Sequence, residues 1–97
     1  MFQAKDVVAI DAIVAPAAGG KYWLQTPVAG KIIDVAVLEH GQPLLVGERI
    51  ARIHSNDDEI LDIVSPQSGT FGYICCKVDT HVDDCDALLN FIPDKEQ

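Results

Sequence analysis

The alternation of apolar and polar positions predicts short strands joined by turns. From Lys31 to Val37 the two kinds of residue alternate with a period of two, which is typical of a strand with one buried face. We expect its inner face to carry Ile33, Val35 and Val37. Further residues then recur at intervals of three, namely Gly41, Leu44, Gly47, Ile50 and Ile53. An amphipathic helix would also fit this spacing, but two glycines and a proline within the run favour turns with the apolar members pointing inward.

The stretch Ile53–Pro66 is typical of a hairpin between two strands. Ile53 on one side and an apolar group on the other side, Ile60, Leu61 and Ile63, would anchor both strands in a core. The residues between them, Ser-Asn-Asp-Asp-Glu at 55–59, favour turns because small polar and acidic side chains bond their own backbone. The tip of the hairpin is therefore expected to be exposed.

The sequences on the two sides of this hairpin repeat one pattern. Thr26–Gly30, with the sequence Thr-Pro-Val-Ala-Gly, matches Ser65–Gly69, Ser-Pro-Gln-Ser-Gly, at a shift of 39 residues. The five residues with threefold spacing are matched at a shift of 38 residues by Asp79, Val82, Cys85, Leu88 and Phe91. A deletion of one residue within 71–78 reconciles the two shifts. The match of Cys85 to Gly47 suggests that Cys85 packs inside.

Two such halves, each built from a few short strands, must pack on each other to bury their apolar faces. We therefore predict an all-β domain with internal pseudo-twofold symmetry. The expected core consists of Ile33, Val35, Leu44, Ile50, Ile53, Ile63, Val82, Leu88 and Phe91. The chain is divided into an N-terminal strand or arm at 1–22, the main domain at 23–93 and a C-terminal tail at 94–97.

Composition narrows the range of partners. The chain has a net charge of −8, and its seven Lys and Arg residues are scattered, which argues against binding nucleic acid. No apolar run approaches the roughly 18 residues of a membrane span, and the N-terminus lacks the basic start of a secretory signal. Three cysteines, two of them adjacent, make a poor disulfide framework. We expect a cytoplasmic protein that contacts neither membrane nor nucleic acid.

The repeated motifs resemble those of the biotinyl/lipoyl domain family, which includes biotin carboxyl carrier domains and the lipoyl domains of 2-oxoacid dehydrogenase acyltransferases. The resemblance covers about residues 24–92 and rests on Thr26–Gly30, Leu38–Ile53 and Ser65–Gly69. It implies a barrel-sandwich hybrid of two four-stranded antiparallel sheets. It also implies a prosthetic group, biotin or lipoate, on a lysine at the tip of the hairpin that joins the halves.

The expected attachment lysine is absent from this hairpin. Counting from Ile53 places the acceptor at Asp57, whereas counting back from Pro66 places it at Asp58, because the connection is one residue longer than usual. Biotin and lipoate are attached through an amide, which requires an amine, and no lysine lies between Lys31 and Lys77. We therefore expect neither cofactor. The acidic residues of the hairpin instead become the candidate contact for a protein partner with a basic surface, namely Asp57, Asp58, Glu59 and Asp62.

Other candidate sites are better explained as solvated surface. Three histidines have no short ligand spacing, namely His40, His54 and His81. A second acidic segment, a turn, lacks the regular spacing of oxygen ligands that calcium-binding loops have; it contains Asp79, Asp83, Asp84 and Asp86. Of the adjacent Cys75 and Cys76, one is expected inside and the other outside. We expect no metal site and no catalytic residue.

These observations predict a non-enzymatic protein-interaction or structural module, associated with a carboxylase or acyltransferase complex. The alternative is a carrier subunit that shuttles a covalently bound group. The lipoyl-like part of an export adaptor is disfavoured because a signal and a coiled-coil insertion between the halves are both missing. The sequence defines no oligomeric state.

Overall fold

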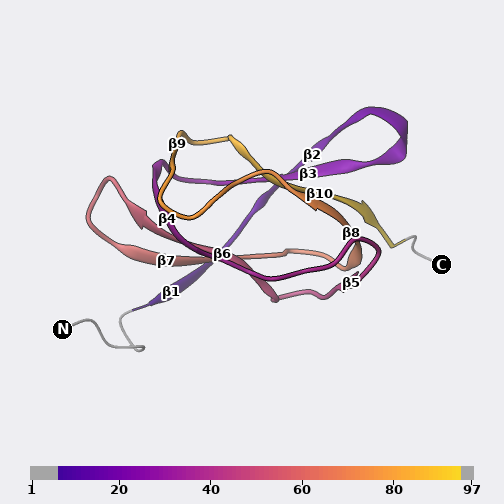
Figure 1. Ribbon diagram of the computed structural model, residues 1–97, viewed down its shortest axis with the longest axis horizontal. Helices are drawn as coiled ribbons and strands as arrows, with labels where there is room; N and C mark the ends of the chain where they lie inside the picture. Colours follow the sequence, from indigo (N-terminus) through magenta and orange to yellow (C-terminus); the bar gives the residue numbers. More distant parts are fainter. Residues whose placement is uncertain (1–6, 95–97) are drawn as a thin grey trace.

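The chain forms two five-stranded sheets in the computed structural model, which describes residues 7–94 (Figure 1). Sheet A contains, in spatial order, β1 (Val8–Asp11), β7 (Ile60–Val64), β6 (Arg49–Ser55), β4 (Gly30–Val35) and β9 (His81–Val82). Sheet B contains β2 (Ile13–Pro16), β3 (Tyr22–Gln25), β10 (Ala87–Pro93), β8 (Gly69–Ile74) and β5 (Pro43–Leu44). One short 3-10 helix, Ala18–Gly20, lies between β2 and β3.

Apolar side chains from both sheets meet in one core, which confirms the predicted all-β sandwich. Its fully buried apolar members are Leu24, Ile32, Leu44, Ile50, Ala51, Ile53, Ile63, Leu88, Leu89 and Phe91. Each sheet keeps two edge strands, so closure into a barrel does not occur. No helix within 7–94 has the length and apolar character needed to cross a membrane.

The N-terminal segment gives each sheet its fifth strand. Ala12 separates β1 from β2; it is 5% exposed, and its N–H donates to the Val64 oxygen at 2.9 Å. β1 pairs in parallel with β7, and β2 pairs in antiparallel fashion with β3, so one segment spans the edges of both sheets (Figure 1). The expectation of two four-stranded, wholly antiparallel sheets is therefore wrong. The physical reason is that Ile10 and Val14 pack on the core and the backbone between them pairs with both sheet edges. Residues 1–6 and 95–97, part of the predicted arm and tail, lie outside the described residues.

The internal repeat governs the strand order of both sheets. The first half of the repeat comprises β3–β6, and the second half comprises β7–β10. In space β7, β6, β4 and β9 of sheet A correspond one by one to β3, β10, β8 and β5 of sheet B. Backbone hydrogen bonds repeat as well: Ile32 N–H donates to Thr80 O at 2.9 Å, and Phe71 N–H donates to Gln42 O at 2.8 Å. The predicted pseudo-twofold relation is thus present down to single bonds.

The same bulge interrupts β4 and β8. The pairing of β4 with β6 skips Ile33, and the pairing of β8 with β10 skips Gly72, which is the equivalent residue. The bulge changes which side chains face inward, because an extra residue shifts the alternation by one. Ile32 is fully buried, Ile33 is only half-buried, and Val37 is 96% exposed. The bulge makes the predicted inner face wrong at Ile33, whereas Val35 packs against the core as a partly buried residue. The prediction is also wrong at Val37, because β4 ends at Val35 and Val37 lies beyond the strand.

The Ser/Thr residues of the repeated motif join the two halves. Thr26 and Ser65 are fully buried, and each hydroxyl donates to a backbone oxygen two residues later, at 2.7 and 2.6 Å. Thr26 N–H donates to Asp86 O of the second half, and Ser65 N–H donates to Glu48 O of the first half, both at 2.9 Å. The motif therefore anchors each half to a turn of the other half.

The motif glycines permit close strand contact. A Cβ atom at Gly30 would overlap the backbone oxygen of His54, and one at Gly69 would overlap that of Ile92. A side chain at either position would force β4 away from β6, or β8 away from β10. Glycine is therefore required by packing at these two places, and positive φ plays no part there.

The threefold-spaced turn residues adopt left-handed backbone conformations. Gly41 and its equivalent Asp79 have φ of 85° and 72°, and Gly47 and its equivalent Cys85 have φ of 82° and 71°. Cys85 is exposed, so the expectation that it packs inside is wrong. The turn determines the backbone conformation at this position, and the side chain does not pack in the core.

Candidate functional site

The β6–β7 hairpin ends in a tight three-residue loop, Asn56–Asp58. Ser55 N–H donates to Glu59 O at 2.8 Å, and Asp58 N–H donates to Ser55 O at 2.9 Å. Asp58 has φ of 66°, the left-handed conformation that closes three-residue hairpin loops. The predicted hairpin and its exposed tip are confirmed. Asp57 occupies the middle of the loop and is exposed.

Neighbouring elements hold the backbone of the tip. Asn56 N–H donates to Ala29 O at 3.0 Å. A short contact of 2.6 Å joins His54 Nε2 to Asp58 Oδ1, and one of 3.3 Å joins His81 Nε2 to Asn56 Oδ1. The Asp58 side chain still has 88% of its surface exposed. The loop is thus fixed in position while its carboxylates face solvent.

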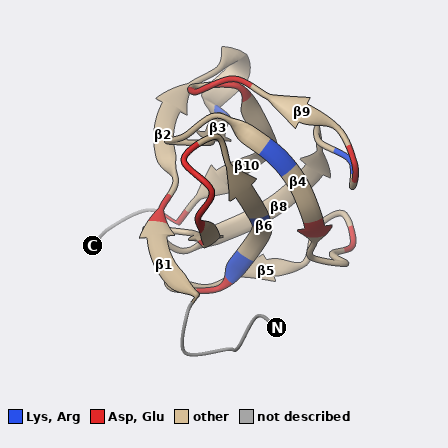
Figure 2. Cartoon of the chain, turned by 90° about the vertical axis from the view of Figure 1, so that its left-hand side faces the viewer, with Lys and Arg blue, Asp and Glu red and all other residues tan. Residues whose placement is uncertain are grey.

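The acidic hairpin and the acidic turns beside β9 lie at the same end of the molecule. Figure 2 looks at this end and shows carboxylate-bearing segments on the hairpin and on both sides of β9. Separate parts of the sequence meet there because β9 pairs with β4 next to the hairpin. The turn residues are Asp79, Asp83, Asp84 and Asp86. An exposed pair, Lys31 Nζ to Asp79 Oδ1 at 3.6 Å, connects β4 to this group. The sequence pattern had given two unrelated acidic segments, because the pairing that unites them is not local.

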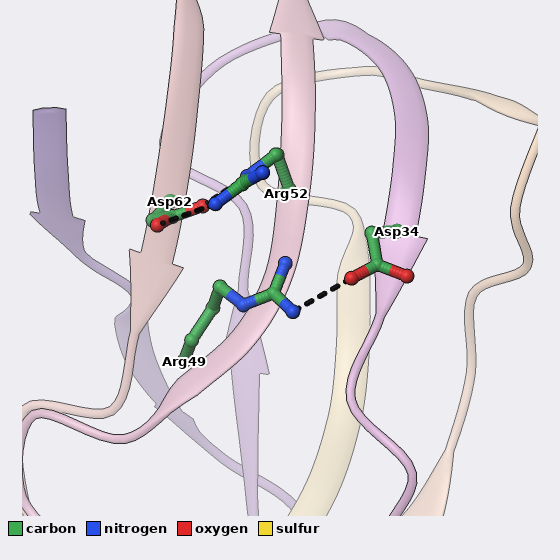
Figure 3. A network of polar contacts seen from close by, with 4 residues as sticks. All are labelled: Asp34, Arg49, Arg52 and Asp62. Atoms are coloured by element: carbon green, nitrogen blue, oxygen red, sulfur yellow. Dashed lines mark hydrogen bonds and ion pairs between the residues drawn. The ribbon is translucent and has the colours of Figure 1, made fainter. Parts of the chain in front are cut away.

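Asp62 lies apart from the tip, on the outer face of sheet A. Its two carboxylate oxygens accept from Arg52 Nε at 2.7 Å and Arg52 Nη2 at 3.3 Å (Figure 3). Arg49 Nη2 donates to Asp34 Oδ2 at 2.6 Å in the neighbouring pair. The hydrogen bond from Arg49 holds the pKa of Asp34 below its usual value. Asp62 is therefore compensated locally, whereas Asp57, Asp58 and Glu59 form the exposed acidic tip.

The remaining candidate groups are separated in space. His40 lies in the connection between β4 and β5, where its Nδ1 is 3.0 Å from Gly72 O of β8, away from the two histidines at the tip. Within residues 7–94, no group of three or more His, Cys, Asp and Glu side chains is arranged to hold a metal ion. Cys76 is buried and Cys75 is exposed, as their adjacency predicted. Burial raises the pKa of the Cys76 thiol to about 11, which keeps it protonated and unreactive at neutral pH.

The tip can therefore attract positive charge but cannot form an amide through a side-chain amine. Its carboxylates belong to the loop and not to a closed pocket, so they are hydrated and have no evident means of acid–base catalysis. Such exposed charge acts mainly on the rate and specificity of association.

Comparisons with known proteins identify a similar fold but no matching family. No family model matches the sequence, and no curated protein matches it. Among solved structures, the chain is similar to part of a single-chain, multi-domain long-chain acyl-CoA carboxylase, with a TM-score of 0.70 and 17% identity. The match covers 84% of this chain and 8% of the carboxylase chain. At this identity the similarity establishes a common fold, and this chain spans a small fraction of the length of that enzyme.

Proposed function

We propose that this protein is a biotinyl/lipoyl-like module that has no attachment lysine and serves as a non-enzymatic interaction or structural component. Support comes from the repeated Ser/Thr-Pro-x-x-Gly motifs, which join the two halves of the sandwich, and from the hairpin that connects these halves. The fold similarity to part of a carboxylase supports an association with a carboxylase or acyltransferase complex.

One observation carries the proposal. The hairpin loop that joins the halves holds Asp57 and Asp58 where this fold family carries its acceptor, and neither offers an amine. A carboxylate cannot form the amide that attaches biotin or lipoate. The module therefore keeps an exposed hairpin tip like that of a carrier domain but carries no covalently attached group.

The acidic tip is the proposed partner contact. Asp57, Asp58 and Glu59 supply exposed negative charge on a loop whose backbone is fixed, and Asp62 contributes less because Arg52 compensates it. The partner is a cytoplasmic protein with a basic surface, since opposite charges accelerate encounter and fix orientation. No nucleic acid, membrane, metal or cofactor takes part.

The test is modification by ligases. The chain is incubated with ATP and a biotin ligase plus biotin, or with a lipoate ligase plus lipoate, and its intact mass is measured. We expect the unmodified mass in both reactions, while a genuine carrier domain in the same mixture gains its group. A mass increase mapped to a peptide covering 53–66 would overturn the proposal and establish a carrier subunit instead.

A further inference from the structure

A surface pocket of about 180 Å³ lies on the outer face of sheet B, beside β8 and β10. Lys21 lines it at the turn between β2 and β3, a turn that projects at the opposite end of the molecule from the acidic hairpin (Figure 1). Gly72, Tyr73, Asn90 and Ile92 form further parts of its lining. This pocket is separate from the proposed partner contact, and nothing in the interaction function requires it.

The pocket exists because the two halves differ at a few equivalent positions. Gly72 corresponds to Ile33 and Asn90 corresponds to Arg52, so sheet B has no side chain and a short side chain where sheet A has two large ones. In sheet A the equivalent region is occupied by the Arg52–Asp62 ion pair. The hollow is therefore a departure from the repeat and not a consequence of the fold.

Asn90 places a side-chain amide in the lining of this hollow. As a whole residue it is only 4% exposed. Its neighbours across the strands are Trp23 and Tyr73, whose rings meet at a centroid distance of 6.2 Å. A Cβ atom at Gly72 would overlap Asn90 Oδ1, so the glycine makes room for the amide. A polar group of a bound ligand can hydrogen-bond this amide in place of water.

The charge around the pocket favours an anion. Lys21 is a cation at its wall, and the outward-facing strand residues around it carry no carboxylate, namely Trp23, Gln25, Thr70, Tyr73 and Ile92. This is unusual in a chain with a net charge of −8. Tyr73 and Ile92 supply apolar surface next to the amide.

We propose that this pocket binds a small carboxylate with an apolar body about the size of one ring. The carboxylate accepts a hydrogen bond from the Asn90 amide and pairs with Lys21, while the body contacts Tyr73 and Ile92. The size follows from the volume, because a cavity of about 150 Å³ is sufficient for benzene. The same site disfavours a neutral amide of equal shape, since the ion pair with Lys21 would be missing.

The test is a titration of the ¹⁵N-labelled protein, followed by amide chemical shifts, with benzoate and with benzamide. We expect saturable shifts for Lys21, Gly72 and Asn90 with benzoate, none at Asp57–Glu59, and weaker binding of benzamide. Lys21→Gln should weaken benzoate binding about two- to fivefold, the range of an exposed ion pair, and leave benzamide binding unchanged.

Lys31→Gln is the matched control, because it removes the same charge from sheet A. It should leave benzoate binding unchanged. Asn90→Ala should abolish binding of both compounds; Lys21→Gln remains decisive if that variant unfolds, because Lys21 is exposed and outside the core. Shifts that do not saturate, equal affinity for benzamide, or equal effects of Lys21→Gln and Lys31→Gln would each overturn the proposal.

Discussion

At the scale of single residues, the positions with a left-handed backbone conformation restrict most strongly which amino acid can be accommodated. Three non-glycine residues of 7–94 have positive φ: Asp58, Asp79 and Cys85. Aspartate tolerates this conformation better than most residues because its short polar side chain can bond locally. Cysteine has no such compensation, and the equivalent position in the first half is Gly47. Cys85 is therefore the residue at which the second half is locally strained.

Replacing Cys85→Gly should raise the free energy of unfolding by about 1 kcal/mol, because it removes the cost of a Cβ atom at positive φ. Urea denaturation under reducing conditions measures the change. The reverse substitution at the equivalent turn, Gly47→Ala, should lower stability by a similar amount, since its Cβ would have open space but the same backbone strain. A loss of stability in Cys85→Gly would show that the thiol makes a contribution of its own.

At the level of elements, sheet A is held by ion pairs that cross its strands. Arg49 of β6 contacts Asp34 of β4, and Arg52 of β6 contacts Asp62 of β7 (Figure 3). The equivalent strands of sheet B carry Trp23, Asn90 and Tyr73 in the row that holds Asp62, Arg52 and Asp34 in sheet A. The two sheets therefore share a backbone but use different chemistry on their outer faces.

The Asp34–Arg49 pair should contribute to stability in a pH-dependent way. The pKa of Asp34 is lowered in the folded state, so its contribution is complete above the unfolded pKa of about 3.9 and is lost as the pH falls through the lower folded value. Asp34→Asn should lower the free energy of unfolding at pH 7 by less than about 1 kcal/mol, because both side chains are partly exposed.

The measurement is urea unfolding of wild type and Asp34→Asn at pH 7 and below pH 3.5. The difference between them should shrink at the acidic pH. Asp79→Asn serves as the control, because its pair with Lys31 is longer and both partners are well exposed. A difference that stays constant with pH would contradict an ionic origin.

Within 22–93, strands and turns could be predicted from the sequence because the repeat shows the pattern of each of them twice. The Ser/Thr-Pro-x-x-Gly motif and the hairpin at 53–66 lie where the pattern places them. The bulges at Ile33 and Gly72 could not be predicted, since an alternating sequence gives no sign of the residue at which its phase changes. The parallel orientation of β1 could not be predicted either, because a partner strand far away in the chain leaves no local signal in the sequence.

The candidate site could be predicted from the sequence only in part. The sequence located the acidic residues of the tip, yet the compensation of Asp62 by Arg52 depends on cross-strand register. The pocket on sheet B was missed. Comparing the halves position by position, Gly72 with Ile33 and Asn90 with Arg52, is the signal that could have revealed it.

At the scale of the whole molecule, charge is unevenly distributed. The acidic hairpin and the turns beside β9 share one end (Figure 2). By contrast, the strands of sheet B around the pocket carry no carboxylate. A basic partner would thus be oriented before contact, because the field is strongest at the end that carries the tip.

Neutralising the tip with Asp57→Asn, Asp58→Asn and Glu59→Gln should slow association with the physiological partner about tenfold at low salt and flatten its salt dependence. The fold should be retained within about 0.5 kcal/mol, and asparagine accepts the positive φ at position 58. Association rates from surface plasmon resonance at several salt concentrations provide the measurement.

The matched control removes three exposed carboxylates elsewhere, with Asp11→Asn, Glu39→Gln and Asp94→Asn. Its association rate should remain near that of the wild type. If both triple variants slow association equally, net charge alone would account for the effect and the hairpin would be only a solvated turn.

The parallel pairing of β1 with β7 also has a consequence for when the strands can pair during synthesis. Val8 lies beside Leu61, so β1 leaves the ribosome when most of its sheet has yet to be translated. At about 5–20 residues per second, the strand waits roughly three to ten seconds for its partner. β2 has its partner β3 within a few residues and can pair at once. The two halves of the N-terminal segment therefore differ: β2 can pair soon after it is made, whereas β1 stays unpaired until β7 has been synthesised.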